Sequence, residues 1–128
     1  MKYIVDAWAW IEYLIGSEYG SKVKLIIENK ENEIFTCSLT ISEVISVTKR
    51  ENRDFEEAYR VILSNSKNID VTPRLSKEAG LMHAEYRKKI KDFGLADAFL
   101  ICLAKSINGK VVTGDRHFKE FSNVILLR

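Results

Sequence analysis

The chain alternates short apolar runs with longer stretches in which apolar residues recur every three or four positions. Short apolar runs between polar or turn-forming residues are typical of buried strands, and the longer spacing indicates helices with one buried face. The runs predict strands at residues 3–5, 33–37, 69–72, 110–113 and 124–126. The spacing predicts helices at residues 7–14, 21–29, 41–50, 55–63, 73–90 and 95–103. This alternation predicts an α/β domain with a mostly parallel sheet of about five strands.

The composition is typical of a single globular domain. The chain has 128 residues, 46% hydrophobic and 30% charged, with no repeat or linker-like segment, so we expect a single domain over residues 1–128. The net charge is only +2, so overall charge by itself does not argue for a nucleic acid partner. Any such argument must come from the local placement of residues.

Other features bear on location. Cys37 and Cys102 lack the spacing of a zinc or redox motif, which predicts free thiols in a reducing compartment. The first apolar run is too short for a signal peptide, and no run approaches the roughly 20 residues of a membrane span. We therefore expect a cytoplasmic protein without a membrane anchor.

Four acidic residues lie where predicted helices begin or strands end, and each has a purely structural explanation. Asp6 can cap the helix that follows it, and Thr40-Ile-Ser-Glu43 matches a capping box. Asp97 can be a first-turn acid that the helix dipole favours, and Asp115 can cap a short helix through residue 121. Each residue taken alone is explained well enough in this way.

Taken together, the four acids are harder to explain by capping. The carboxyl ends of parallel strands meet at one edge of a sheet, so Asp6, Glu43, Asp97 and Asp115 should converge there. A cap contributes about 1 kcal/mol, whereas two like charges about 4 Å apart repel by roughly 4 kcal/mol at an effective dielectric near 20. Such a cluster is favourable chiefly around a cation, and carboxylates without His or thiolate suit Mg²⁺ or Mn²⁺.

The sequence resembles the PIN-domain nucleases, and within them the small VapC-like toxins of toxin–antitoxin pairs. The resemblance runs nearly end to end and is carried by four segments, of which the last two are the most specific: YIVDAWAWI, SLTISEV, GLADAFLICLAKSING and KVVTGDRHF. It implies a PIN-like three-layer α/β/α domain. It also implies a metal-dependent endoribonuclease that hydrolyses single-stranded or loop RNA and leaves a 5′-phosphate and a 3′-hydroxyl.

The resemblance assigns residues to roles. Asp6, Glu43, Asp97 and Asp115 correspond to the acidic metal site, and Thr113 corresponds to the hydroxyl that commonly precedes the last Asp by two residues. VapC-like proteins usually pair with a small antitoxin and often form dimers, so we expect both partners. Trp8 departs from the family pattern, in which Ser, Thr or Asn is common near the first Asp.

The remaining candidates are less specific. We interpret Trp8 and Trp10 as core or dimer-contact residues rather than base-stacking platforms. The histidines at 83 and 117 are weak candidates for a ligand or base. Candidate RNA contacts, each of which can equally belong to a solvated charged face, are Lys49, Arg50, Arg53, residues 87–91, Arg116 and His117.

Three alternatives stay open. The fold can serve as a catalytically silent binding module whose acids hold a partner's Arg or Lys. It can also be an RNA-processing nuclease unrelated to toxin–antitoxin function. A phosphoacceptor receiver domain is more distant, because its acceptor Asp ends the third strand and Asp70 is expected inside that strand.

Overall fold

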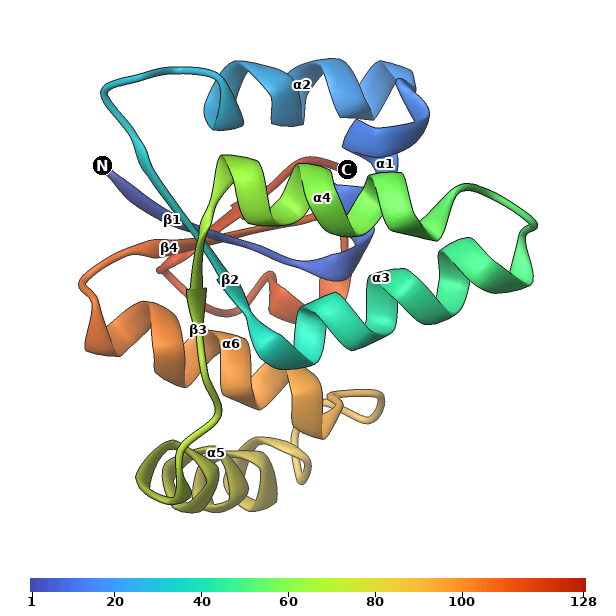
Figure 1. Ribbon diagram of the computed structural model, residues 1–128. Coiled ribbons are helices and arrows are strands. Elements are labelled where there is room, and N and C mark those ends of the chain that lie inside the picture. Colours follow the sequence, from blue (N-terminus) through green and yellow to red (C-terminus); the bar gives the residue numbers. More distant parts are fainter.

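The computed structural model describes all 128 residues and contains one sheet of five parallel strands (Figure 1). The strands pair in the order β3-β2-β1-β4-β5. Their bounds are Lys2–Val5 for β1, Glu33–Cys37 for β2, Lys67–Ile69 for β3, Lys110–Thr113 for β4 and Val124–Leu126 for β5. The predicted α/β class and the parallel sheet are confirmed.

Helices cover both faces of this sheet and give the expected three layers (Figure 1). One face carries α1 (Ala7–Ile15), α2 (Glu18–Ile27), α3 (Ser38–Arg50) and α4 (Phe55–Asn65). The other carries α5 (Pro73–Tyr86), α6 (Leu95–Ser106) and the short 3₁₀ helix η1 (Arg116–Phe118). None of the helices combines the length and apolar character needed to cross a bilayer.

The alternation of side chains along the central strands divides the core in two. Ile4 and Val111 pack toward α5 and α6, whereas their neighbours Val5 and Val112 pack toward α1 to α4. All four are fully buried. Successive residues of a strand point to opposite faces, so a strand buried on both faces is apolar throughout. This explains why the buried parts of β1 and β4, residues 3–5 and 111–112, appear in the sequence as short apolar runs.

The chain path reverses direction at the centre of the sheet. From β1 it moves outward through β2 to β3, and then α5 and α6 return it across the opposite face to β4, beside β1. In open parallel sheets, ligands bind outside the carboxyl ends of the strands where this reversal occurs. The carboxyl ends of β1 and β4 are therefore the expected place for a site.

Some predicted boundaries were wrong. β3 spans Lys67–Ile69 rather than 69–72, because it is an edge strand whose exposed Lys67 and Asn68 pair through their backbones and leave no apolar pattern. Asp70 therefore follows the strand instead of lying inside it. α5 ends at Tyr86, although Ile90 continues the apolar spacing, because a turn after the helix packs Ile90 against the same core.

Helix α3 also begins earlier than predicted. It starts at Ser38 instead of residue 41, directly after β2, with Cys37 as the N-terminal cap residue in extended conformation. Glu43 therefore lies in the second turn. The capping box read from Thr40 to Glu43 is wrong, since neither residue is at a helix end.

Candidate metal centre

The four acidic residues line one cavity of about 490 Å³ at the carboxyl ends of β1 and β4. Asp6 follows β1, Glu43 lies on α3, Asp97 is in the first turn of α6, and Asp115 comes two residues after β4. The expected convergence is therefore present in the fold. The other residues that line the cavity are Ala7, Trp8, Ala96, Leu100, Arg116, His117 and Arg128.

Asp6 is the deepest of the four carboxylates, with 6% of its surface exposed. Its Oδ1 accepts a hydrogen bond of 2.8 Å from the Ala9 N–H and so caps α1. The pKa of Asp6 is raised to about 7, chiefly by burial. Hydrogen bonds from the Thr113 side chain and the Ala9 N–H lower the pKa, and the carboxylates of Asp115 and Asp97 raise it. Without a cation, this side chain is held in an unfavourable place for a negative charge.

Thr113, the last residue of β4, links two of the acids. Its side chain is fully buried, and its Oγ1 accepts a hydrogen bond of 2.9 Å from the Asp115 N–H. The same side chain forms the hydrogen bond that lowers the pKa of Asp6. A single hydroxyl therefore orients the loop that carries Asp115 and also supports the charge on Asp6.

Asp97 and Glu43 have raised pKa values for the same main reason. Burial is the largest cause for both, and the Asp97 charge also raises the pKa of Glu43. For Asp97, a hydrogen bond of 2.9 Å from the Gly94 N–H to Oδ2 works in the opposite direction, and Asp115 raises the pKa further. The charges of these carboxylates disfavour one another across the cavity.

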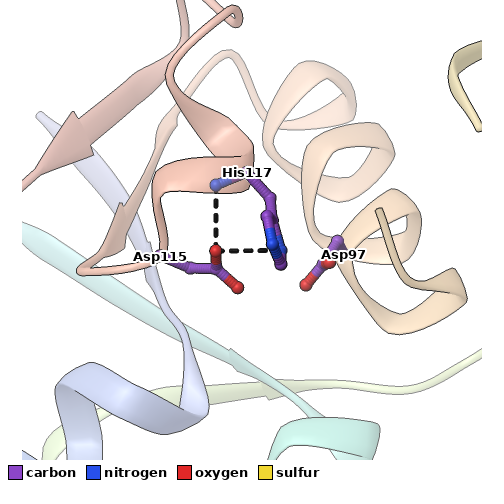
Figure 2. A group of neighbouring side chains, drawn as sticks. All are labelled: Asp97, Asp115 and His117. Atoms are coloured by element: carbon purple, nitrogen blue, oxygen red, sulfur yellow. Dashed lines mark hydrogen bonds and ion pairs between the residues drawn. The ribbon is translucent and has the colours of Figure 1, made fainter. Parts of the chain in front are cut away.

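Figure 2 shows Asp97, Asp115 and the imidazole of His117 turned toward a common space. One ligand atom from each of the three lies within 4.8 Å of the others. The Asp115 Oδ1 accepts the His117 N–H at 2.9 Å and lies 3.0 Å from the ring Nδ1. From the sequence His117 is only a weak candidate for a ligand, but in the structure its side chain borders the acids directly.

Capping and ion binding turn out to be compatible here. Asp6 and Asp115 each accept a backbone N–H as caps, as expected, and Asp97 accepts the Gly94 N–H, but each does so with a single oxygen. The second oxygens of Asp97 and Asp115 accept no hydrogen bond. They remain available to another ligand.

The donor chemistry fits a hard divalent cation. No Lys or Arg forms an ion pair with any of the four acids, and the imidazole of His117 lies beside Asp115. A cation of the Mg²⁺ type relieves the repulsion between carboxylates and stabilises the ionised forms of Asp6, Glu43 and Asp97, whose pKa values are raised. Their roles as metal ligands stay a prediction.

The predicted basic contacts divide into two groups. Arg116 and His117 line the cavity. Lys49 instead lies over the ring of Phe55, and Arg53 pairs with Glu51. Of the other basic candidates, Arg50, Arg87 and the lysines at 88, 89 and 91 do not line the cavity either.

Two residues at the cavity were missed as site residues. Trp8 lines its wall, whereas Trp10 is buried in the core, where its Nε1 donates to the Thr36 hydroxyl. Arg128, just beyond β5, lines the same wall. A signal for Arg128 existed in the sequence, since residues that follow a parallel strand lie at the carboxyl edge.

Comparison with known families identifies the class of protein. The family model of the PIN domain matches residues 3–124. The chain therefore belongs to the PIN-domain family, as the four segments indicated. A search of curated protein sequences finds no match.

Solved structures show the same fold at low sequence identity. A toxin–antitoxin complex from Klebsiella pneumoniae has a TM-score of 0.73 at 19% identity, with 98% of each chain covered. VapBC2 from Rickettsia felis, bound to a DNA fragment of its promoter, has a TM-score of 0.73 at 21% identity and covers 98% of this chain and 97% of that one. VapC20 of Mycobacterium tuberculosis, a toxin that cleaves the sarcin–ricin loop, has a TM-score of 0.76 at 16% identity and covers 95% and 96%.

Proposed function

We propose that this protein is a Mg²⁺- or Mn²⁺-dependent endoribonuclease and the toxin of a VapBC-type toxin–antitoxin pair. One observation carries the proposal: four carboxylates from distant parts of the chain line one cavity, and no Lys or Arg forms an ion pair with them. Membership of the PIN-domain family supports the nuclease activity. The toxin role is supported by the VapBC structures that share the fold.

In this proposal the four acids contact the cation from different depths of the cavity. Asp6, fixed by Ala9 and Thr113, forms the floor of the site, while Asp97 and Asp115 offer their free oxygens from α6 and the loop after β4. Glu43 approaches from α3 and completes the set. When bound, a divalent cation supplies charge neutralisation at the phosphate and increases the acidity of water.

The deciding experiment is cleavage of a pool of structured RNAs by the purified, antitoxin-free protein. We expect cleavage with Mg²⁺ or Mn²⁺, none with EDTA, and loss of activity in Asp97→Asn, which keeps the shape but removes the charge. Asp54→Asn is the matched control, because Asp54 caps α4 away from the cavity and Asn is also a good cap. Equal cleavage by the Asp97 variant would indicate a contaminating nuclease and defeat the proposal.

Two expected partners need separate tests. A short reading frame for an antitoxin next to this one, whose product copurifies and inhibits cleavage, would support the toxin role over a housekeeping RNA-processing role. Light scattering of the purified protein tests the expected homodimer. If no metal permits cleavage by the antitoxin-free protein, the acid cavity is better explained as a binding module.

A further inference from the structure

Arg128 is an arginine beside four carboxylates that pairs with none of them. It lines the same cavity as Asp6, Glu43, Asp97 and Asp115, yet no ion pair joins it to any acid. Its Nε instead donates a hydrogen bond of 3.2 Å to the Gly114 carbonyl. Its guanidinium carbon lies 5.5 Å from the centre of the Trp8 ring. The side chain is exposed but has two defined contacts.

The backbone brings Arg128 to this position. The Leu127 N–H donates to the carbonyl of Thr113, the last residue of β4, at 2.8 Å, which extends the pairing with β4 one residue past the end of β5. Gly114, the acceptor for Arg128, lies between Thr113 and Asp115. The guanidinium is therefore tied to the same loop that presents Asp115 to the cavity.

Trp8 is partly buried, lines the cavity wall and contacts this arginine together with two other neighbours. Its ring meets the edge of Tyr19, with the ring centres 5.4 Å apart. On another side the indole fills the space beside Gly114, where a Cβ would lie 2.6 Å from its ring carbons. With Arg128 over the ring as well, the indole contacts three neighbours. An arginine over Trp gains cation–π attraction.

The unused donors of Arg128 match the chemistry of a phosphate. A guanidinium carries five N–H groups, and the Gly114 carbonyl occupies one, which leaves the others for an anion. An acidic cavity repels RNA, so a phosphate next to the acids needs a fixed positive charge nearby. Arg116 and Arg128 are the arginines on the cavity wall, and Arg128 is the one held by Trp8 and Gly114.

The geometry points to Arg128 as a positioning residue that binds a phosphate of single-stranded RNA next to the acid cluster, with Trp8 as its support. This inference rests on the proposed function, because it names a substrate contact of the same site. It explains why this chain has Trp at position 8, where the family resemblance led us to expect a small polar residue.

Two measurements test the assignment. The first is binding of a short, fluorescein-labelled single-stranded RNA to the Asp97→Asn protein over a range of salt concentrations. Loss of one phosphate contact reduces the slope of log Kobs against log salt by about 0.7, so we expect that change in Asp97→Asn with Arg128→Gln. Adding Arg74→Gln instead is the control, because Arg74 is exposed on α5 and pairs with Glu78.

The second measurement is steady-state cleavage by the protein with its four acids intact. We expect Arg128→Gln to raise KM roughly tenfold with little change in kcat, since a contact made equally to substrate and transition state acts on KM. The KM of Arg128→Lys should lie between those of the unsubstituted protein and Arg128→Gln, because Lys keeps the charge but loses the forked geometry. Trp8→Leu should resemble Arg128→Gln, and Trp8→Phe should be milder.

The outcomes separate this inference from the proposed function. If Arg128→Gln matches Arg74→Gln in both salt slope and KM, the inference fails while the nuclease assignment stands. If the protein never cleaves RNA but the salt slope still depends on Arg128, the nuclease assignment fails and the phosphate contact stands. If the Asp97→Asn protein does not bind RNA at all, the inference is overturned.

Discussion

The Thr113 hydroxyl accepts a hydrogen bond of 2.9 Å from the backbone N–H of Asp115, and the Thr113 side chain also supports the Asp6 carboxylate. Thr113, at the end of β4, therefore links the acid that follows β1 to the acid that follows β4. Hydrogen bonds of this kind orient metal ligands without contacting the metal.

Replacement of Thr113 by Val tests this role, because Val keeps the shape and removes the hydroxyl. We expect Thr113→Val to weaken Mn²⁺ binding by about 10- to 100-fold. The free energy of unfolding should fall by about 1–3 kcal/mol, since the Asp115 N–H and Asp6 lose a partner in a buried place. Calorimetric titration with Mn²⁺ and urea denaturation measure the two effects. Thr113→Ser, which retains the hydroxyl, should keep most of the affinity; equal losses in both variants would contradict the explanation.

Asp6 should make the stability of the metal-free protein depend on pH. Its pKa is about 7 in the folded chain and about 4 in an unfolded one, so the folded state binds the proton more tightly. Stability from this group is fully present below about pH 4 and is lost as pH rises through about 7. The total loss is roughly 4 kcal/mol at most, and burial of Glu43 and Asp97 acts in the same direction.

Urea denaturation in EDTA at a series of pH values measures this dependence. We expect Asp6→Asn to flatten the profile between about pH 4 and 7 and to be more stable than the unsubstituted protein near pH 8. Asn also caps helices, so α1 should persist. Saturating Mg²⁺ should flatten the profile of the unsubstituted protein, because the cation replaces the proton. An unchanged profile in Asp6→Asn, together with an unchanged Asp54→Asn control, would show that Asp6 is not the responsible group.

His117 should influence which metal the site prefers. Its ring and the carboxylates of Asp97 and Asp115 can face one ion (Figure 2), and imidazole nitrogen suits later transition metals better than Mg²⁺. We expect His117→Gln to weaken Co²⁺ binding on the order of tenfold and Mg²⁺ binding much less. The absorption spectrum of bound Co²⁺ should change as well. Equal losses for both metals would indicate a role limited to the loop around Asp115.

Most of the fold could be predicted because its signals are local. The apolar runs around Ile4 and Val111, the helical spacing in α2 and the nearly continuous apolar stretch of α6 each lie within one element. β3 was misplaced because Lys67 and Asn68 form an edge strand through backbone pairing, which polar side chains do not reveal. The predicted start of α3 lies three residues too late, because the residue at its cap position, Cys37, makes no side-chain hydrogen bond and so gives no capping signal.

The site was predictable to the extent that topology determines it. Asp6 and Asp115 follow strands that are neighbours in any sheet of this order, so their proximity follows from chain connectivity. The contact between Trp8 and Arg128 joins opposite ends of the chain, and no spacing in the sequence encodes it. The position of the His117 ring depends on the turn of η1, and a helix of three residues is too short to leave a recognisable pattern in the sequence.

Two glycines in helices should respond to alanine in opposite ways. Gly20 is buried in α2 against α1, and a Cβ there would overlap the Glu12 carbonyl, so Gly20→Ala must push the two helices apart. We expect it to reduce the free energy of unfolding by about 2 kcal/mol or more. Gly80 is exposed in α5 with open space around its Cα, so Gly80→Ala should stabilise by about 0.5–1 kcal/mol through helix propensity. Urea denaturation of both variants tests the packing of α1 on α2, on which the position of the Asp6 cap depends, and a neutral Gly20→Ala would contradict that packing.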